Sequence, residues 1–189
     1  PRERRGHIRN GERMTGDAGT GEEQWNLAVA TTGDDALRDL VIHTLAQAMD
    51  DAPEPDEDGD VPIWIEDVPT FATADAEGGV VHLATFLAEN IADRARAAEV
   101  LTDLQLEFPE FKFVLHHDRV TAEQRVAACP LVPLHLLRAV GAVVPLVGQV
   151  RALADRLGGD ACVFDGPADT VAGENLLGGD CGCGNCTCG

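Results

Sequence analysis

The chain has 189 residues, the length of one ordinary domain with extensions. Hydrophobic residues make up 44% of it, enough for an apolar core, while no apolar run approaches the roughly 18 residues of a membrane span. The 33 acidic and 14 basic residues give a formal charge of −19, which argues against a nucleic-acid partner because such binding needs clustered Lys and Arg.

The N-terminal segment is basic and carries no folding pattern. Residues 1–13 hold five Arg and two Glu, a charge of +3 that leaves −22 for the rest of the chain. They contain one large apolar side chain, Ile8, and no periodicity. We predict a disordered extension over residues 1–32, within which Met14 is a candidate for the natural start.

A first helix is predicted from Asp34 and Asp35, whose carboxylates can cap a helix N-terminus. The acidic loop Asp50–Asp60 follows it, with seven acids and two Pro. This composition indicates a solvated loop; a calcium loop is the alternative, although the Gly and Glu of an EF-hand are missing downstream. The apolar stripe of the helix, at spacings of mostly three and four, consists of Leu37, Leu40, Val41, Leu45 and Ala48.

Three strands are predicted next. Val61–Glu66 alternates between apolar and other side chains, and Pro62 favours an edge position for it. Thr70–Ala74 is short, and Val80–Leu87 follows after a Gly-rich turn. These strands read as an antiparallel meander.

The next predicted helix is capped by Asn90 and ends before Pro109. Its predicted apolar face consists of Ile91, Ala95, Ala98 and Leu101. A strand over Phe111–Leu115 and a weaker one over Arg119–Ala128 come after it.

The longest apolar-periodic stretch, Leu134–Leu157, is predicted to be helical. Pro145 inside it predicts a kink or two helices end to end. The element order predicts an α+β fold, with an antiparallel sheet and helices packed on one face. We therefore expect a folded domain over residues 33–158 and a flexible Gly-rich tail over residues 159–189.

Two stretches of this domain resemble a known group. Residues 91–104 (IADRARAAEVLTDL) with 108–115 (FPEFKFVL), and residues 129–137 (CPLVPLHLL), are similar to the YbjN-like, type III secretion chaperone-like domains that are found in actinobacterial proteins as TY-Chap domains. The resemblance covers roughly residues 33–157. It implies a binding or chaperone module, often dimeric, with no shared catalytic residues.

The end of the tail carries four cysteines in a Cys-x-Cys-x-x-Cys-x-Cys array: Cys181, Cys183, Cys186 and Cys188. Thiolates are the ligands that zinc and copper favour, so we predict a metal site here. Disulfide formation in an oxidising compartment is one alternative, and a redox role for the central Cys-x-x-Cys spacing is another.

A different class of function is suggested by the residues just before the array. Leu176-Leu177-Gly178-Gly179 resembles the double-glycine end of a leader peptide. On that hypothesis the chain is the precursor of a ribosomally made modified peptide. Its leader ends with the pair Gly178-Gly179 and is cut off after Gly179, which leaves residues 180–189 as the Cys-rich core.

The other titratable candidates are isolated. Cys129 is predicted to be buried, and Cys162 lies in a short apolar run that could dock as an edge strand or pair with Cys129. His116 and His117 are adjacent on a strand, so their rings should point to opposite faces and not share an ion. His43 and His135 are lone helical residues that favour surface or packing roles.

No hydrolase elbow, phosphate loop, dinucleotide fingerprint or zinc-protease motif is present, so an enzyme is disfavoured. The leading hypothesis is a cytoplasmic, non-enzymatic binding or chaperone-like module with a metal-binding tail, zinc or copper being the expected cofactor. Its expected partner is another polypeptide, for which the acidic surface favours basic character. A homodimer is implied by the resemblance, and neither nucleic acid nor membrane is expected.

Overall fold

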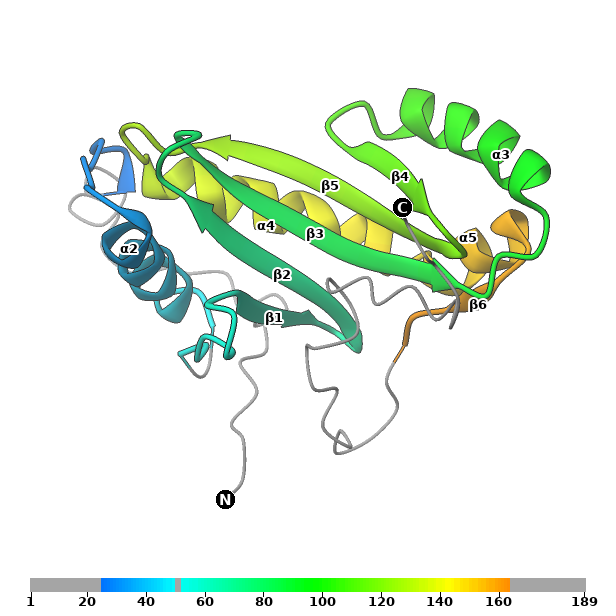
Figure 1. Ribbon diagram of the computed structural model, residues 1–189, viewed down its shortest axis with the longest axis horizontal. Coiled ribbons are helices and arrows are strands. Elements are labelled where there is room, and N and C mark those ends of the chain that lie inside the picture. Colours follow the sequence, from blue (N-terminus) through cyan, green and yellow to red (C-terminus); the bar gives the residue numbers. More distant parts are fainter. Residues whose placement is uncertain (1–24, 50–51, 164–189) are drawn as a thin grey trace, which may run out of the picture.

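The computed structural model describes residues 25–49 and 52–163. Within them the chain forms an antiparallel sheet with helices packed on one face, an α+β fold in the predicted element order (Figure 1). The elements are α2 (Asp34–Ala46), β1 (Val61–Ile65), β2 (Val68–Asp75), β3 (Val80–Glu89), α3 (Arg94–Glu107), β4 (Lys112–His116), β5 (Arg119–Ala127), α4 (Pro133–Val147), α5 (Val150–Leu157) and β6 (Asp160–Ala161).

The sheet order is β1-β2-β3-β5-β4, with every neighbouring pair antiparallel. The predicted meander of the first three strands is confirmed, and β1 lies at an edge as Pro62 indicated. β2 is longer than predicted, because Val68 and Pro69 already pair with Ile65 and Trp64 of β1. A register shift in β3 between Phe86 and Ala88 interrupts its ladder with β5.

The core lies between the sheet and the helices α2, α4 and α5. Alternation along β1 turns Val61, Ile63 and Ile65 toward these helices, where each is at most 1% exposed. Burial of one such aliphatic side chain contributes about 1.5–3 kcal/mol. The helical side of the core is built mainly from Leu37, Val41, Leu45, Leu136, Val140, Val143, Leu146, Leu153 and Leu157.

Helix α2 begins where predicted, but the predicted residues do not cap it. The N-cap is Gly33, which has no side chain to accept a hydrogen bond, and Asp34 and Asp35 lie in the first turn. The Asp34 carboxylate instead accepts a hydrogen bond of 2.7 Å from the backbone N–H of Ala76, which ties the helix to the β2–β3 turn. The helix also ends before Ala48, which is therefore exposed.

Helix α3 differs from the prediction in both cap and phase. Its N-cap is Asp93, whose carboxylate accepts a 3.0 Å hydrogen bond from the N–H of Arg96. Asn90, the predicted cap, has a φ of 58° and lies before the helix. Of the predicted apolar face, Ala95 and Ala98 are exposed, whereas Ala97 and Leu104 are buried instead.

The long C-terminal stretch is two helices, as one reading of Pro145 predicted. Pro145 lies inside α4, and the break comes at Gly148 and Gln149. The two helices are bent by 65°. Over the described residues no single helix is long and apolar enough to cross a membrane; α4 and α5 reach that length only when they are taken together.

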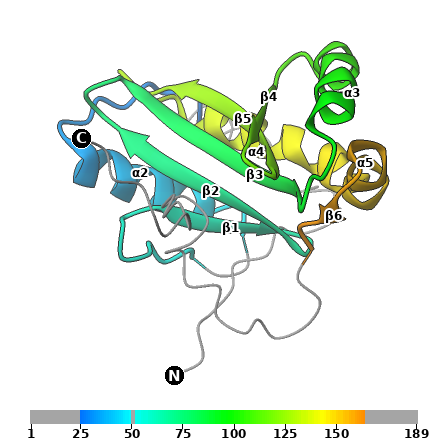
Figure 2. The ribbon, with the colours of Figure 1, turned by 45° about the vertical axis from the view of Figure 1, so that its right-hand side comes forward.

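Regular contacts extend beyond both expected boundaries of the domain. β6 pairs with the end of β3 and carries Cys162 into the structure, as an edge strand can (Figure 2). On the N-terminal side, Val29 forms a bridge with Leu131. The structured unit thus includes residues of both predicted extensions: Val29 from residues 1–32, and β6 with Cys162 from residues 159–189.

Candidate functional site

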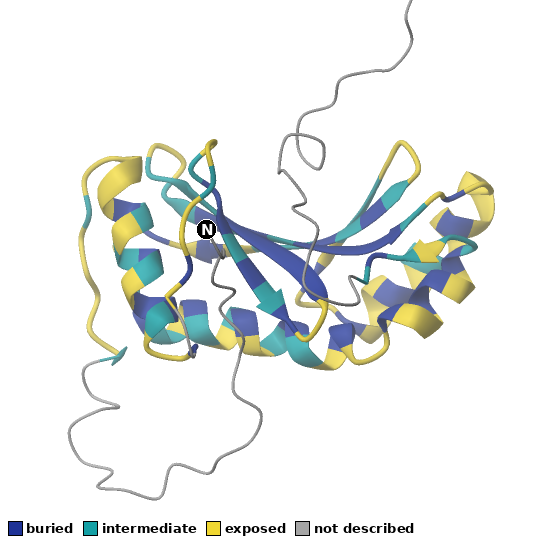
Figure 3. Cartoon of the chain, turned by 90° about the horizontal axis from the view of Figure 1, so that it is seen from below, coloured by how far each residue is buried: buried dark blue, intermediate teal, exposed yellow. Residues whose placement is uncertain are grey.

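One face of the sheet carries no described helix. Figure 3 shows α2, α4 and α5 on the same side of the sheet, with the opposite face turned away from them. Strand alternation assigns every second side chain to this helix-free face. Its side chains come from β1 (Pro62, Trp64), β2 (Pro69, Phe71, Thr73), β3 (Val80, His82, Ala84, Phe86), β5 (Thr121, Glu123, Arg125) and β4 (Lys112, Val114, His116).

A small apolar cluster lies on the helix-free face. The rings of Phe71 and Phe86 meet edge to face at 5.7 Å, and Cys162 packs against them. Burial, and then the nearby Glu89 carboxylate, raises the pKa of the Cys162 thiol to about 12, opposed by Arg119. Such a thiol stays protonated at neutral pH and acts as an apolar side chain.

The two described cysteines do not form the disulfide that was considered. Both are free thiols. Cys129 is exposed, so the prediction that it is buried is wrong. The reason is that it lies in the turn after β5, where the chain has left the sheet.

Charges on the helix-free face largely compensate one another. Lys112 lies 3.1 Å from Glu123. Arg119, which is paired with His116 and so belongs to the same face, lies 4.0 Å from Glu89 at the end of β3. These pairs are exposed enough to contribute little to stability, but they keep the face near neutrality in a strongly acidic chain. Arg125 adds a cation at the margin of the same face.

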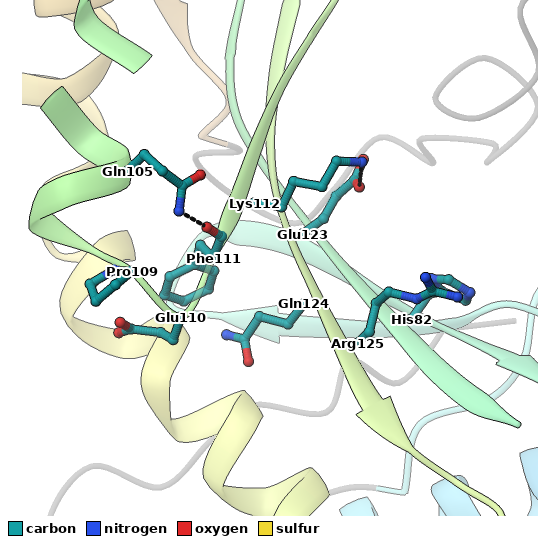
Figure 4. A pocket seen from close by; sticks show the side chains of 9 residues that line it. All are labelled: His82, Gln105, Pro109, Glu110, Phe111, Lys112, Glu123, Gln124 and Arg125. Atoms are coloured by element: carbon teal, nitrogen blue, oxygen red, sulfur yellow. Dashed lines mark hydrogen bonds and ion pairs between the residues drawn. The ribbon is translucent and has the colours of Figure 1, made fainter. Parts of the chain in front are cut away.

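A pocket of about 630 Å³ opens at this margin, beside β5 (Figure 4). It exists because β4 begins only at Lys112, opposite Glu123, whereas β5 continues to Ala127. The segment before β4 turns away and is fixed by a hydrogen bond from the Gln105 side chain to the Phe111 carbonyl oxygen. The pocket is lined by His82, Gln105, Pro109, Glu110, Phe111, Lys112, Glu123, Gln124 and Arg125.

The histidine pair is arranged differently from the prediction. His117 lies in the β4–β5 turn with a φ of 51°, so strand alternation does not apply to it. Its ring meets that of His116 at a centroid distance of 4.2 Å. His43 and His135 are exposed on α2 and α4.

The acidic loop forms its own hydrogen bonds. The Asp56 carboxylate accepts from the N–H groups of Asp58 and Asp60, at 3.1 and 2.9 Å. The Asp60 carboxylate accepts a 2.6 Å hydrogen bond from Thr73. Burial raises the pKa of Asp60, the bond from Thr73 lowers it, and the charges of Asp56 and Asp58 raise it. Over the described residues, no three His, Cys, Asp or Glu side chains are grouped to hold a metal ion.

The residues predicted to bind a metal or to mark a cleavage site lie outside the described residues. These are Cys181, Cys183, Cys186 and Cys188, with Gly178 and Gly179 before them. Zinc or copper binding and cleavage therefore stay predictions. No sequence motif marks the pocket residues. The one signal is that the predicted strands differ in length, Arg119–Ala128 being longer than Phe111–Leu115.

Comparisons with known proteins agree with this architecture. Residues 35–165 match the model of a family described as T3SS (YopN, CesT) and YbjN peptide-binding chaperone 1. A similar solved structure is the ExsC–ExsE complex, with a TM-score of 0.53 and 11% sequence identity, over 66% of this chain and 98% of the other. At that identity the likeness concerns the fold alone. No curated protein matches the chain.

Proposed function

Because the chain belongs to the family of T3SS and YbjN peptide-binding chaperones, we propose that its folded domain binds a segment of another polypeptide on the helix-free face. The observation that supports this site is a broad sheet face of mixed apolar and polar side chains with no described helix over it. The pocket at its margin extends this surface toward α3. We propose no catalytic role.

The chemistry of the face supports a partner segment in which apolar and hydrogen-bonding side chains alternate. Half-exposed Val80, Val114 and Trp64 offer apolar contact, while Lys112 and Arg125 offer charge-assisted hydrogen bonds. The structural neighbour was solved as a complex of two proteins, ExsC and ExsE, and a polypeptide partner here is the analogous proposal.

The finer expectations remain proposals. The formal charge of −19 supports a basic partner, whereas the near-neutral helix-free face supports an uncharged one. A homodimer, a cytoplasmic location and a metal-loaded tail likewise stay predictions.

The test is binding of the full-length chain to an immobilised array of randomised 15-residue peptides. Thr121 lies in the middle of the helix-free face, paired with Phe86 on one side and Val114 on the other. Thr121→Arg should place a bulky cation there and weaken peptide binding at least roughly tenfold, the loss of a contact worth about 1.4 kcal/mol.

The matched control is Leu106→Arg, which adds the same side chain at a residue of α3 that is 81% exposed. Circular dichroism should show that both variants remain folded. Equal peptide binding by the two variants would move the site away from the helix-free face, and a full-length chain that retains no peptide would contradict the proposed function itself.

A further inference from the structure

We propose that residues 164–177 of this chain, the tail segment, fold back over the helix-free face and compete with a partner polypeptide for it. The tail segment directly follows the described residues, so the face and its occupant belong to one molecule. The docking itself needs no partner; only the competition rests on the proposed function.

The chain arrives at the helix-free face in β6. Cys162 packs against Phe71 and Phe86 on that face. Its neighbour Val163 packs against the core between the sheet and the helices, on the opposite side. Because the side chains of an extended segment alternate between two sides, Phe164 is expected to point again toward the cluster of Phe71 and Phe86. The tail segment thus begins with a large apolar ring next to two others.

Neighbouring elements leave the chain one open direction after β6. β6 pairs with Ala88 and Glu89 of β3, and β2 occupies the same edge of β3 from Thr85 onward. The chain therefore cannot continue in the plane of the sheet. On the helical side, α5 packs against β6 (Figure 2). Among the described helices none covers the helix-free side, so the tail segment has room there (Figure 3).

The composition of the tail segment suits this face. The segment contains three acidic residues and no Lys, Arg or His. Half-exposed apolar side chains of the face, such as Val80 and Val114, can receive its apolar residues. Because the segment is attached to the face, its effective concentration is of the order of millimolar, at which weak contacts suffice. Its large apolar residues are Phe164, Val171, Leu176 and Leu177.

Arg125 is the charged group of the face that fits an acidic occupant. It is exposed, and within the described ranges no carboxylate is paired with it. A carboxylate of the tail segment next to its guanidinium would accept a charge-assisted hydrogen bond. Three other basic side chains of the face lie close to described carboxylates: Lys112 to Glu123, Arg119 to Glu89, and His82 to Asp75.

The length of the chain decides which acidic residue can reach Arg125. Arg125 pairs with a residue of β3 four positions before Phe86, about 13 Å along the strand. Asp165 is two residues beyond Val163, a span of at most about 7 Å, whereas Asp169 is six residues beyond it and spans up to about 20 Å. Asp169 is therefore the first acidic residue that reaches the guanidinium.

The first test maps the position of the tail segment in the full-length chain without any peptide. Incorporation of p-benzoylphenylalanine at Val171 should give, on irradiation, crosslinks to β2, β3 or β5 of the same chain. Mass-spectrometric mapping identifies them at the mass of a monomer. The same group at Ile8 is the control, because the basic N-terminal segment does not suit the face.

Three results would overturn the docking. Crosslinks from position 171 that are absent, or confined to the helices, would place the segment elsewhere. Crosslinks found only at the mass of a dimer would make a second copy the occupant. Crosslinks to the face from position 8 and not from position 171 would assign the face to the N-terminal segment.

The second test concerns the ion pair. Arg125→Glu should lower the crosslinking yield from position 171 roughly two- to fivefold, the effect expected for one exposed ion pair. Arg138→Glu makes the same charge change at an exposed residue of α4, on the other side of the sheet, and should leave the yield unchanged. Asp169→Arg in the Arg125→Glu chain should restore the yield. Equal yields from the two single variants would overturn the contact with Arg125.

The third test measures the competition, with the tightest-binding 15-residue peptide of the array as the probe. Phe164→Ser in the full-length chain should raise its affinity roughly tenfold, the gain expected when a face covered about nine-tenths of the time becomes free. Leu106→Ser, a matched change at an exposed residue of α3, should bind like the unchanged chain.

The two proposals fail separately. Unchanged peptide affinity for Phe164→Ser would overturn the competition and leave the proposed function standing. Crosslinks from position 171 to the face, in a chain of which no variant binds peptide, would contradict the proposed function and support the docking of the tail segment.

Discussion

Cys162 and Cys129 show how differently two free thiols of one chain are placed. Cys162 lies in the Phe71–Phe86 cluster, where its pKa is raised to about 12, while Cys129 is exposed in a turn. The reactive species is the thiolate, whose fraction at pH 8 falls about tenfold for each unit by which the pKa exceeds the pH. Burial of Cys162 also hinders the approach of a reagent to its sulfur.

We therefore expect iodoacetamide at pH 8 to modify native Cys162 at least about 100-fold more slowly than Cys129. Mass-spectrometric peptide mapping separates these two sites from the four tail cysteines. The difference should vanish in guanidinium, where both thiols are exposed. Comparable rates in the native chain would show that Cys162 is not held in the cluster.

Residues with positive φ mark where local sequence rules stopped applying. Asn90 and His117 have φ values of 58° and 51°, and each follows a strand. Strand alternation ends at such a residue, so the two His rings meet although adjacent strand residues should diverge. A left-handed residue other than Gly leaves little signal in the sequence.

At the scale of elements, the order and type of the helices and strands were predictable, and the phase of one helix was not. The apolar periodicity of α3 is weak because the helix itself carries small Ala residues on several of its faces. The stripe that faces inward consists of Ala97, Val100, Leu101 and Leu104, which shares only Leu101 with the predicted face. Contact with β4 and α5 decides between the alternatives, and a sequence alone does not contain that information.

Two leucines of α3 test this phase directly. Leu104 is 0% exposed and Leu106 is 81% exposed. Leu104→Ala should destabilise the domain by about 2–5 kcal/mol because it leaves a cavity, whereas Leu106→Ala should stay within about 0.5 kcal/mol. Urea unfolding followed by circular dichroism measures both. Similar losses for the two variants would mean that α3 packs with another face.

At the scale of the molecule, the α+β architecture followed from element order, because an antiparallel meander with amphipathic helices has few ways to bury both apolar faces. The pocket did not follow from it. It depends on where β4 starts relative to β5, and strand ends are fixed by tertiary contacts such as the bond from Gln105 to Phe111. The C-terminal extent of the domain was not predictable either. β6 has only two residues and no periodicity, so its place in the sheet depends on tertiary contacts.

The position of β6 predicts that the folding unit does not end at 158 but extends at least to residue 163. Asp160 accepts a 2.9 Å hydrogen bond from the side chain of Asn90, and the N–H of Cys162 donates to the Leu87 carbonyl oxygen at 3.2 Å. A chain cut after residue 159 loses these bonds and the burial of Cys162, so we expect it to be about 1–3 kcal/mol less stable than a chain cut after residue 163. For a domain of this size each kcal/mol lowers Tm by about 2–4 °C.

Calorimetry of the two truncated chains measures the difference, with Cys162→Ala in the longer one to separate side-chain burial from strand pairing. Equal melting temperatures would place β6 outside the cooperative unit and return the boundary to the end of α5.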